Sequence, residues 1–463
     1  MKKLAVIFIL LGLSGCGNLW DDYKYPETKT PENWNAKIDE NGAYPDAKWW
    51  EEFNSAELTS LVEEARKNNY DLKAAVARVH EADAQAKIAG AALLPSVDVG
   101  ADASKTQHGR AATPAASRTT SSYNATATAS YELDFWGKNW SAEKAAEALA
   151  KGSRYDKQTV LLTITSSVAD IYFDMLATKK RLEVAESNLA TAKKLLDSMK
   201  RRQAAGIAAA LDVVQQESVV EAQDATLPPL KLELAQDRSA LAILLGKLPE
   251  DVKLAEEKFA DMKAPKVSVG LPSELLQRRP DVQFAEAQLI AADANITNAR
   301  AQFFPDISLT AGAGYASNAL STLVSPGSSL FTLGASLTQP IFEGGRLSGL
   351  LGYNKARYDE LLNGYHKAVI SAFSDVENSL AAVEQAKDGE NIATKAEKTA
   401  KKAFNLSQEQ FKNGIVDITT TLNTQRTLFA AENSLVQAKL ATLQATVGLY
   451  QALGGGWKDS GKR

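Results

Sequence analysis

Residues 123–133 read YNATATASYEL, and this stretch decides the fold because it alternates apolar and polar side chains without a break. Tyr, Ala and Leu occupy one face, while Asn, Thr, Ser and Glu occupy the other, which is the period-two pattern of a β-strand. A run of about 11 residues is also what a tilted strand needs to cross a bilayer. A soluble antiparallel sheet with one solvated face gives the same alternation, so both interpretations stand at this point.

Three other segments show the same alternation: 96–106 more weakly, and 307–315 and 331–338 clearly. The loops between the paired strands, 107–122 and 317–328, are polar or small. The sequence therefore predicts two strand hairpins. Aromatic residues stand at several strand ends, as the interfacial girdles of membrane barrels require: Tyr123, Tyr131, Phe135, Trp136, Tyr315, Phe331 and Phe342.

Four strands cannot close a transmembrane barrel, because the smallest such barrels need about eight. Open edges inside lipid would leave backbone groups unpaired, at several kcal/mol each. If the strands span a membrane, copies of the chain must assemble, as a dimer with about eight strands or a trimer with about 12. Side chains nearly fill an eight-stranded barrel, whereas a larger one leaves a pore, so conduction favours the trimer.

Long helical segments follow the strand hairpins. Residues 139–205 and 346–413 contain no proline and keep apolar or Ala residues at the 3,4 spacing of coiled coils. Each segment, of about 67 residues, would extend about 100 Å as a helix. A glycine-marked turn follows each, at Gly206 and Gly414. A helix of about 25–35 residues is predicted before each strand hairpin, ending at Pro95 or Pro305.

The two halves of the chain repeat one another. We therefore predict two copies of one unit, at 70–246 and 280–454, joined by a linker at 247–279 and followed by a tail at 455–463. Pro228-Pro229 has no counterpart in the second copy and must break or bend the return helix of the first. Five motifs recur, identically or conservatively, at offsets of 208 to 210: Asp71-Leu72, Ala82-Asp83-Ala84, Leu93-Leu94-Pro95, Gly206-Ile207 and Leu245-Gly246.

The first 16 residues predict the compartment. Lys2 and Lys3 precede an apolar run at 4–13, which suits a signal-peptide core and is too short to span a bilayer. The sequence LSGC at 13–16 resembles a bacterial lipobox, which implies cleavage of a signal peptide at 1–15 and acylation of Cys16. Gly17, by resemblance to lipoprotein sorting, favours the outer membrane. We expect a lipid-anchored segment at 16–69; a chance Cys after an ordinary signal peptide is the alternative.

Composition argues against several other classes. The 52 Lys and Arg and 56 Asp and Glu give a net charge of −4 without a long basic run, which argues against nucleic acid. One Cys and three scattered His indicate no metal site, and we expect no cofactor. The sequence shows no nucleophile motif or phosphate loop, so we predict no catalytic residue and no enzyme. The chain after the signal peptide contains no run of about 18 apolar residues, so the sequence predicts no transmembrane helix.

Seven further motifs carry a family resemblance: Trp49-Trp50 with Phe53, Asn69-Tyr70-Asp71-Leu72, Arg278-Arg279-Pro280-Asp281-Val282, Phe303-Phe304-Pro305, Gln339-Pro340-Ile341-Phe342, Gly344-Gly345-Arg346 and Thr424-Gln425-Arg426. On this twofold repeat, they resemble the outer-membrane efflux protein family, TolC-like and nearest to its NodT and OprM lipoprotein subgroup. The resemblance covers almost everything after Cys16. It implies a mainly α fold with transmembrane β-strands, a trimeric twelve-stranded outer-membrane barrel continuous with a long periplasmic helical barrel. It also implies an equatorial belt formed by 17–60, the chain end and the region near 220–240.

The resemblance further implies a periplasmic gate at the turns marked by Gly206 and Gly414. Carboxylates are common in the family at positions 420 and 423, so the Thr and Asn here weaken a cation-attracting ring that Asp212 and Asp417 could partly replace. We hypothesise that an Asp212–Arg426 contact helps to hold the closed state; a solvated surface pair is the alternative. The gate region carried over by position consists of Asp212, Thr419, Thr420, Asn423 and Arg426.

The implied function is passive export of drugs or other small toxic compounds. The implied partners are two further copies of the chain, outer-membrane lipid, a periplasmic adaptor (membrane fusion) protein and an inner-membrane pump of RND type. A type I protein-secretion or ABC-exporter channel of the same fold is the first alternative, and a non-conducting coiled-coil lipoprotein spacer is the second. The transported compound is not indicated, because selectivity lies mostly in the pump.

Overall fold

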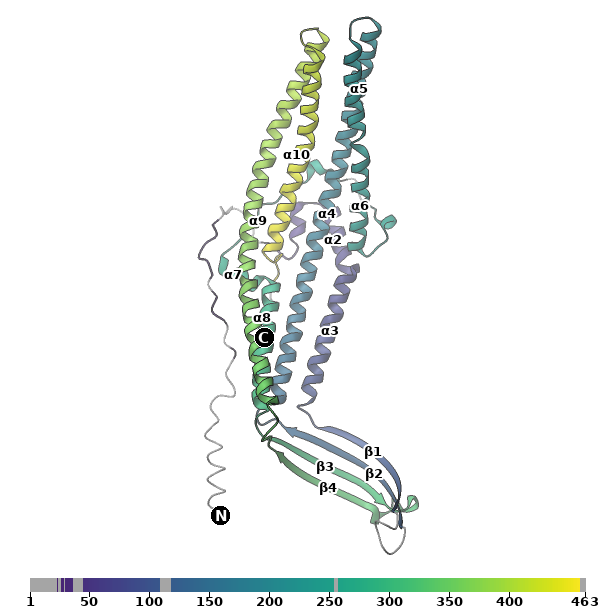
Figure 1. Cartoon of the computed structure of the whole chain (residues 1–463), viewed down its shortest axis with the longest axis vertical. Helices are drawn as coiled ribbons and strands as arrows, with labels where there is room; N and C mark the ends of the chain where they lie inside the picture. Colours follow the sequence, from purple (N-terminus) through teal and green to yellow (C-terminus); the bar gives the residue numbers. More distant parts are fainter. Residues whose placement is uncertain are drawn as a thin grey trace. The chain divides into compact units, whose positions relative to one another are not determined.

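The computed structural model describes residues 23, 26–28, 30–35, 45–108, 118–253 and 257–458 (Figure 1). They are mainly helical and contain one four-stranded sheet. The chain forms two compact units, of which the first is mainly Arg78–Arg154 with Phe284–His366. The second consists of Thr28–Ala77, Tyr155–Gln283 and Lys367–Arg463. Each copy of the predicted repeat therefore contributes segments to both units.

The elements follow the order predicted from the repeat. A short helix η2 (Trp49–Phe53) and α2 (Ala56–Asn68) precede the first copy, and α7 (Pro272–Arg278) precedes the second. The first copy consists of α3 (Tyr70–Ala91), β1 (Ser96–His108), β2 (Arg118–Leu133), α4 (Lys138–Ala204), α5 (Ala210–Asp224) and α6 (Leu227–Leu245). The second consists of α8 (Pro280–Ala301), β3 (Asp306–Ser317), β4 (Ser329–Thr338), α9 (Arg346–Lys412) and α10 (Ile418–Ala452).

The four predicted strands are confirmed, and they form one antiparallel sheet in the order β1-β2-β3-β4 (Figure 1). β2 and β3, which come from different repeats of the same chain, are the central pair, with Tyr131 opposite Leu309. The first hairpin is longer than predicted, because β1 continues to His108 and β2 begins at Arg118. Positions 119–122 of the extended β2 are Thr and Ser, and β-branched Thr is well suited to a pleated strand.

The two long helices are confirmed within one residue at each end. Gly206 and Gly414 follow them with φ of +73° and +72°, a conformation that a residue with a Cβ rarely adopts. The predicted break in the first return helix is also confirmed. α5 ends at Asp224, and Pro228 and Pro229 lie in the first turn of α6, where a missing backbone N–H costs nothing. α10 runs unbroken for 35 residues.

The predicted helices of 25–35 residues are wrong in length, since α3 and α8 each have 22 residues. They begin where the two copies begin, at Tyr70 and Pro280, but end at Ala91 and Ala301, four residues before Pro95 and Pro305. The residue before each helix sets its start. Asn69 is extended, with ψ of 132°, and separates α2 from α3, while its side chain accepts a hydrogen bond from the Leu72 N–H. Arg279 is likewise extended, with ψ of 113°, because the ring of Pro280 disfavours a helical conformation in the residue before it.

Small residues let the helices of the first unit approach closely. Ala145, Ala291 and Ala294 form a buried cluster between α4 and α8. A Cβ added to Gly152 of α4 would lie 3.3 Å from the Cβ of Ala287. Helix packing distance depends on the side chains at the contact, so this Ala-rich seam brings the two helix axes close together.

The second unit has an aromatic core near the start of the described chain. Trp49 stacks on Tyr450 of α10, with ring centroids 4.9 Å apart, and Phe53 packs on Phe173 of α4 at 5.0 Å. The hydroxyl of Tyr450 donates to Glu52 at 2.6 Å. The Trp-Trp motif of the sequence is therefore a packing motif, which joins η2 to α4 and to the end of α10.

The linker between the copies is tied to the start of α2. Glu257 accepts hydrogen bonds from the Ser55 hydroxyl at 2.6 Å, the Tyr172 hydroxyl at 2.8 Å and the Glu57 N–H at 3.1 Å. Carboxylates at a helix N-terminus interact favourably with the helix dipole. These hydrogen bonds lower the pKa of Glu257 despite the opposing effect of burial.

One window of 18 residues in α4 has a mean hydropathy of 1.4, so by length and composition alone it is apolar enough to cross a membrane. Within the chain, 56% of that window is buried. The core helix of a packed protein passes the same test, and α4 buries Ile164, Val168 and Met175. Core packing therefore accounts for its hydropathy.

Candidate functional site

The sheet has one apolar face, because the register aligns the alternation of all four strands. Val99 lies opposite Ala127, Ala127 opposite Ala313, and Ala313 opposite Phe331. In a soluble sheet this face would be covered by the rest of the protein. Instead, Val99 is 84% exposed and Phe331 is 74% exposed. A large exposed apolar face needs another apolar phase against it, which favours lipid over water.

The opposite face of the sheet is polar along its whole width. Asp98 lies opposite Thr128, Thr128 opposite Gly312, and Gly312 opposite Thr332. Alternating strands with one lipid face and one polar face are the pattern of transmembrane barrels that line an aqueous lumen. β1 and β4 are the edges of this sheet, so a second sheet edge must pair with each of them if the strands lie in lipid.

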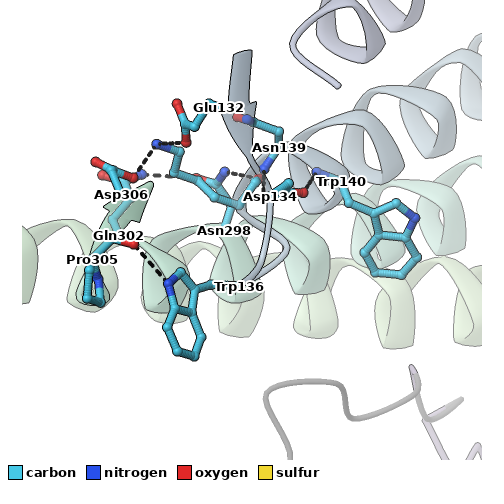
Figure 2. A network of polar contacts seen from close by, with 10 residues as sticks. Glu132, Asp134, Trp136, Asn139, Trp140, Asn298, Gln302, Pro305 and Asp306 are labelled. Atoms are coloured by element: carbon cyan, nitrogen blue, oxygen red, sulfur yellow. Dashed lines mark hydrogen bonds and ion pairs between the residues drawn. The ribbon is translucent and has the colours of Figure 1, made fainter. Parts of the chain in front are cut away.

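A polar network joins the sheet to the long helix α4 (Figure 2). The Lys138 Nζ lies 2.8 Å from Asp306 at the start of β3 and 2.5 Å from Glu132 at the end of β2. The Trp136 Nε1–H donates to the Pro305 carbonyl at 2.8 Å, and its ring stacks on Phe304 with centroids 4.7 Å apart. Residues of both copies therefore meet at this junction.

The start of α4 is capped within the same network. Asp134 accepts hydrogen bonds from the backbone N–H groups of Asn139, at 3.0 Å, and Trp140, at 2.7 Å. Asn298 of α8, labelled in Figure 2, contributes to this network. Its side-chain amide donates to the Lys138 carbonyl at 2.7 Å. A capping carboxylate satisfies helix N–H groups that otherwise lack a partner. The network thus fixes where strand β2 ends and helix α4 begins.

The predicted gate residues lie near the starts of the return helices: Asp212, Thr419 and Thr420 in the first turns, and Asn423 and Arg426 in the second and third turns of α10. The Asp212 carboxylate accepts a hydrogen bond from the Ala209 N–H at 3.1 Å. Asp417 caps α10 by accepting from the N–H and the hydroxyl of Thr420, both at 2.8 Å. These two hydrogen bonds, the backbone one first, lower the pKa of Asp417. Asp417 therefore carries a fixed negative charge at this turn.

The structure does not bring Asp212 and Arg426 together within one chain. In the described part of the chain they form no ion pair or hydrogen bond with each other. Thr419, Asn423 and Arg426 are exposed. Arg426 lines a cleft of about 670 Å³ between α4, the α5–α6 break and α10, together with Arg181 and Phe429.

Sequence analysis missed a bridge between three helices at this cleft. Arg181 of α4 donates to both oxygens of Glu233 on α6, at 3.0 and 3.1 Å, and to Asn433 of α10 at 3.0 Å. Glu233 lies close to the Pro228-Pro229 break. The only sequence signal is one complementary pair of charges on neighbouring helices, which many surface pairs share.

Three further carboxylates between α4 and α6 were also missed. Burial, with a smaller contribution from the charge of Asp174, raises the pKa of Asp170 to about 7. Burial raises the pKa of Asp237 to about 6, with contributions from Asp174 and Glu233. Burial also raises the pKa of Asp174, against a hydrogen bond from Gln444 at 3.1 Å. These groups hold protons at a pH where solvated carboxyls have lost them.

We predict that Asp170→Asn makes the protein more stable at alkaline pH. The folded pKa of Asp170 lies above its unfolded value of about 3.9, so the folded state binds more protons in between, and stability falls as pH rises from about 4 to 7. The variant should be more stable than the parent at pH 8 by about 1–2 kcal/mol and show a flatter pH profile. Thermal unfolding between pH 5 and 8 measures this, with exposed Asp197→Asn on the same helix as control. Parallel profiles for parent and variant would contradict the prediction.

Two other sequence expectations concern Cys16 and metals. Cys16 and the predicted signal peptide lie outside the described residues. Among the residues that the structure describes, no group of three His, Cys, Asp or Glu side chains is arranged to hold a metal ion.

Comparisons with known proteins agree with this geometry. The chain matches the family model described as "Outer membrane efflux protein" over residues 61–247 and 271–455. It is 40% identical to the pyoverdine export outer membrane protein OpmQ of Pseudomonas aeruginosa, over 99% of this chain and 98% of the relative. It is 33% identical to the probable efflux pump outer membrane protein TtgC of Pseudomonas putida, over 99% and 96%.

Solved structures show the same fold. The outer-membrane channel OprN superposes with a TM-score of 0.86 at 26% identity, over 93% of this chain and 99% of that chain. The open-state MtrE outer membrane channel of Neisseria gonorrhoeae has a TM-score of 0.86 at 29% identity, over 95% and 98%. The predicted fold class, a TolC-like trimeric channel with helical and β parts, is confirmed. These relatives are channels rather than enzymes. The chain belongs to the outer membrane efflux protein family and is an outer-membrane efflux channel.

Proposed function

We propose that this channel is the passive exit duct of a tripartite export system, working with a periplasmic adaptor and an inner-membrane pump. The observation that carries the proposal is the sheet, which has a continuous polar face, an exposed apolar face and two open edges. Three copies joined at these edges give a barrel of about 12 strands, wide enough for an aqueous lumen. Such a barrel supplies a path but no energy, so the driving force must come from a partner.

The turns that follow the two long helices, at Gly206 and Gly414, support contact with a partner protein. Ile207 and Ile415, at equivalent positions of the two copies, are 68% and 69% exposed, and Leu211 is 64% exposed. Exposed apolar residues at both turns favour contact with another protein. We assign the adaptor to this end.

We assign the gate to the same turns. Arg426→Ala should raise conductance and drug leakage, and unchanged values would exclude Arg426 from the gate. The gate region consists of Asp212, Thr419, Thr420, Asn423 and Arg426.

Two classes of compound are candidates for the substance that the channel exports. The first is small toxic compounds, including drugs, because several relatives at 33% identity are named as efflux pump components, among them an antibiotic efflux protein. The second is a siderophore, because the two relatives at 40% identity are both named for pyoverdine export. Deleting the gene and measuring drug susceptibility and siderophore secretion in parallel separates them. A type I protein-secretion role would instead show as loss of a secreted protein.

We also propose that Cys16 carries a lipid anchor after removal of residues 1–15. The LSGC sequence supports this, and so does the absence of any other Cys in the chain. Cys16→Ser should abolish incorporation of labelled palmitate, and continued labelling would contradict the anchor.

The proposed domain organisation follows the repeat: a lipidated segment at 16–69, repeats at 70–246 and 280–454 around a linker at 247–279, and a tail at 455–463.

The central prediction is that the purified chain is a trimer that conducts. Detergent-extracted protein should have the mass of three copies, and it should form discrete ion-conducting events in a planar bilayer. The control is Val99→Pro, which removes a backbone donor from the edge strand β1. We expect this variant to lose both the trimer and the conductance. A lone, non-conducting particle from the parent chain would refute the duct and leave the coiled-coil spacer.

A further inference from the structure

Charged side chains are rare on the polar face of the sheet. At the end next to α4, Glu132 and Asp306 both pair with Lys138. Away from the two ends of the sheet, the polar-face positions of β2, β3 and β4 carry Ser, Thr, Asn, Gly and Ala or Leu. The exceptions lie on β1, where the register places Asp98 and Asp102 on this face. Both are carboxylates.

Neither carboxylate is neutralised in the described part of the chain. Asp98 lies opposite Thr128 and Asp102 opposite Asn124, so no cation faces them across β2. Both side chains are exposed, and neither forms an ion pair or hydrogen bond among the described residues. Lys105, the cation nearest in sequence, occupies the opposite face of β1, because odd-numbered residues of this strand point away from the polar face.

We propose that Asp98 and Asp102 make the barrel itself cation-selective, as two acidic rings that line its lumen. The inference rests on the proposed closure of three copies into one barrel. Each position then contributes three carboxylates. Four residues of strand separate the rings by about 13 Å. On its open side, β1 would meet β4 of the neighbouring polypeptide in the trimer. The polar-face residues of that β4 between its ends are Thr332, Gly334 and Ser336, which carry no charge.

Coulomb's law gives the expected size of the effect. Three carboxylates about 10 Å from the axis, screened at about 0.1 M salt, raise the local cation-to-anion ratio on the order of fourfold per ring. At about 1 M salt the Debye length shrinks to about 3 Å, and the preference should fade.

The test is the reversal potential of single channels across a tenfold KCl gradient at low salt, in the full-length protein. Asp98→Asn with Asp102→Asn keeps side-chain size and removes both rings. We expect the cation preference of the parent to fall on the order of fourfold or more, while the unitary events persist. Lys105→Gln, on the opposite face, is the matched control and should leave the preference unchanged. Thr128→Asp adds a carboxylate beside Asp98 and should increase it.

A second measurement reports on the barrel separately from the helical gate. Hexaamminecobalt(III), added on the barrel side, should reduce conductance in the parent and do so at least several times less effectively in the double variant. Equal block and equal reversal potential in parent and double variant would overturn the inference while leaving the channel intact. Failure of the parent to form channels would overturn the closure on which the inference rests. The two failures are therefore distinguishable.

Discussion

Trp49→Ala should lower the free energy of unfolding by about 3–5 kcal/mol, because it empties an aromatic core that the surrounding helices cannot refill. Trp49 is 1% exposed. Its ring stacks on Tyr450 and also meets Phe53 edge to face, with centroids 6.2 Å apart. A Cβ added to Gly455 would approach the Trp49 indole nitrogen to 3.3 Å, so the tail closes over the ring. Thermal unfolding followed by far-UV circular dichroism measures the loss.

Two conservative variants separate the ring from the polar contact in this core. Trp49→Phe keeps an aromatic ring against Tyr450 and should cost about half as much as Trp49→Ala. Tyr450→Phe keeps the ring and removes only the hydrogen bond to Glu52, and should cost about 1 kcal/mol. If Trp49→Ala unfolds at the temperature of the parent, the aromatic core does not hold η2 to α10.

Arg279→Ala should lower the free energy of unfolding by about 3 kcal/mol. The Arg279 side chain is 11% exposed, and its guanidinium holds Asp281 at 2.6 and 3.0 Å and Asp375 at 2.9 Å. It also donates to the Ala452 carbonyl at the end of α10, at 3.3 Å. Removing it leaves two carboxylates and a carbonyl without their common donor, and disconnects the start of α8 and the middle of α9 from the end of α10.

The neighbouring arginine is the matched control. Arg278 pairs with Glu274 one turn earlier in α7 but reaches neither Asp281 nor Asp375, and Arg278→Ala should cost about 1 kcal/mol. Arg279→Lys keeps the charge but loses the planar fork, so its stability should fall between that of the parent and of Arg279→Ala. Denaturant midpoints for the three variants give the ranking. Equal losses for Arg278→Ala and Arg279→Ala would contradict the bridging role.

The strands and long helices could be predicted because their signals are local. Alternation along 123–133 fixes both the strand and the side of the sheet on which each residue stands, and the register then aligns these faces across four strands. The glycines at 206 and 414 and the proline pair at 228 mark breaks through backbone conformation alone. Such features need no partner from elsewhere in the chain.

The contacts that depend on tertiary placement could not be predicted. The Arg-Arg-Pro-Asp-Val motif carries a family resemblance, but nothing local indicates that Arg279 reaches Asp375 and Ala452. The same holds for Arg181, whose partners Glu233 and Asn433 lie 52 and 252 residues away. The Asp212–Arg426 contact is predicted only from the position of both residues near the glycine-marked turns. Within one chain, the Asp212 carboxylate instead binds its own helix end at Ala209.

The unpaired edges β1 and β4 have a genetic consequence. A barrel shared by three polypeptides accepts whichever copies are available, provided that their edges still pair. If parent and a pairing-competent but blocked mutant are made in equal amounts, only about one-eighth of the assemblies are free of the mutant. A blocked allele should thus be dominant, whereas an allele that destroys an edge, and so never joins an assembly, should be recessive.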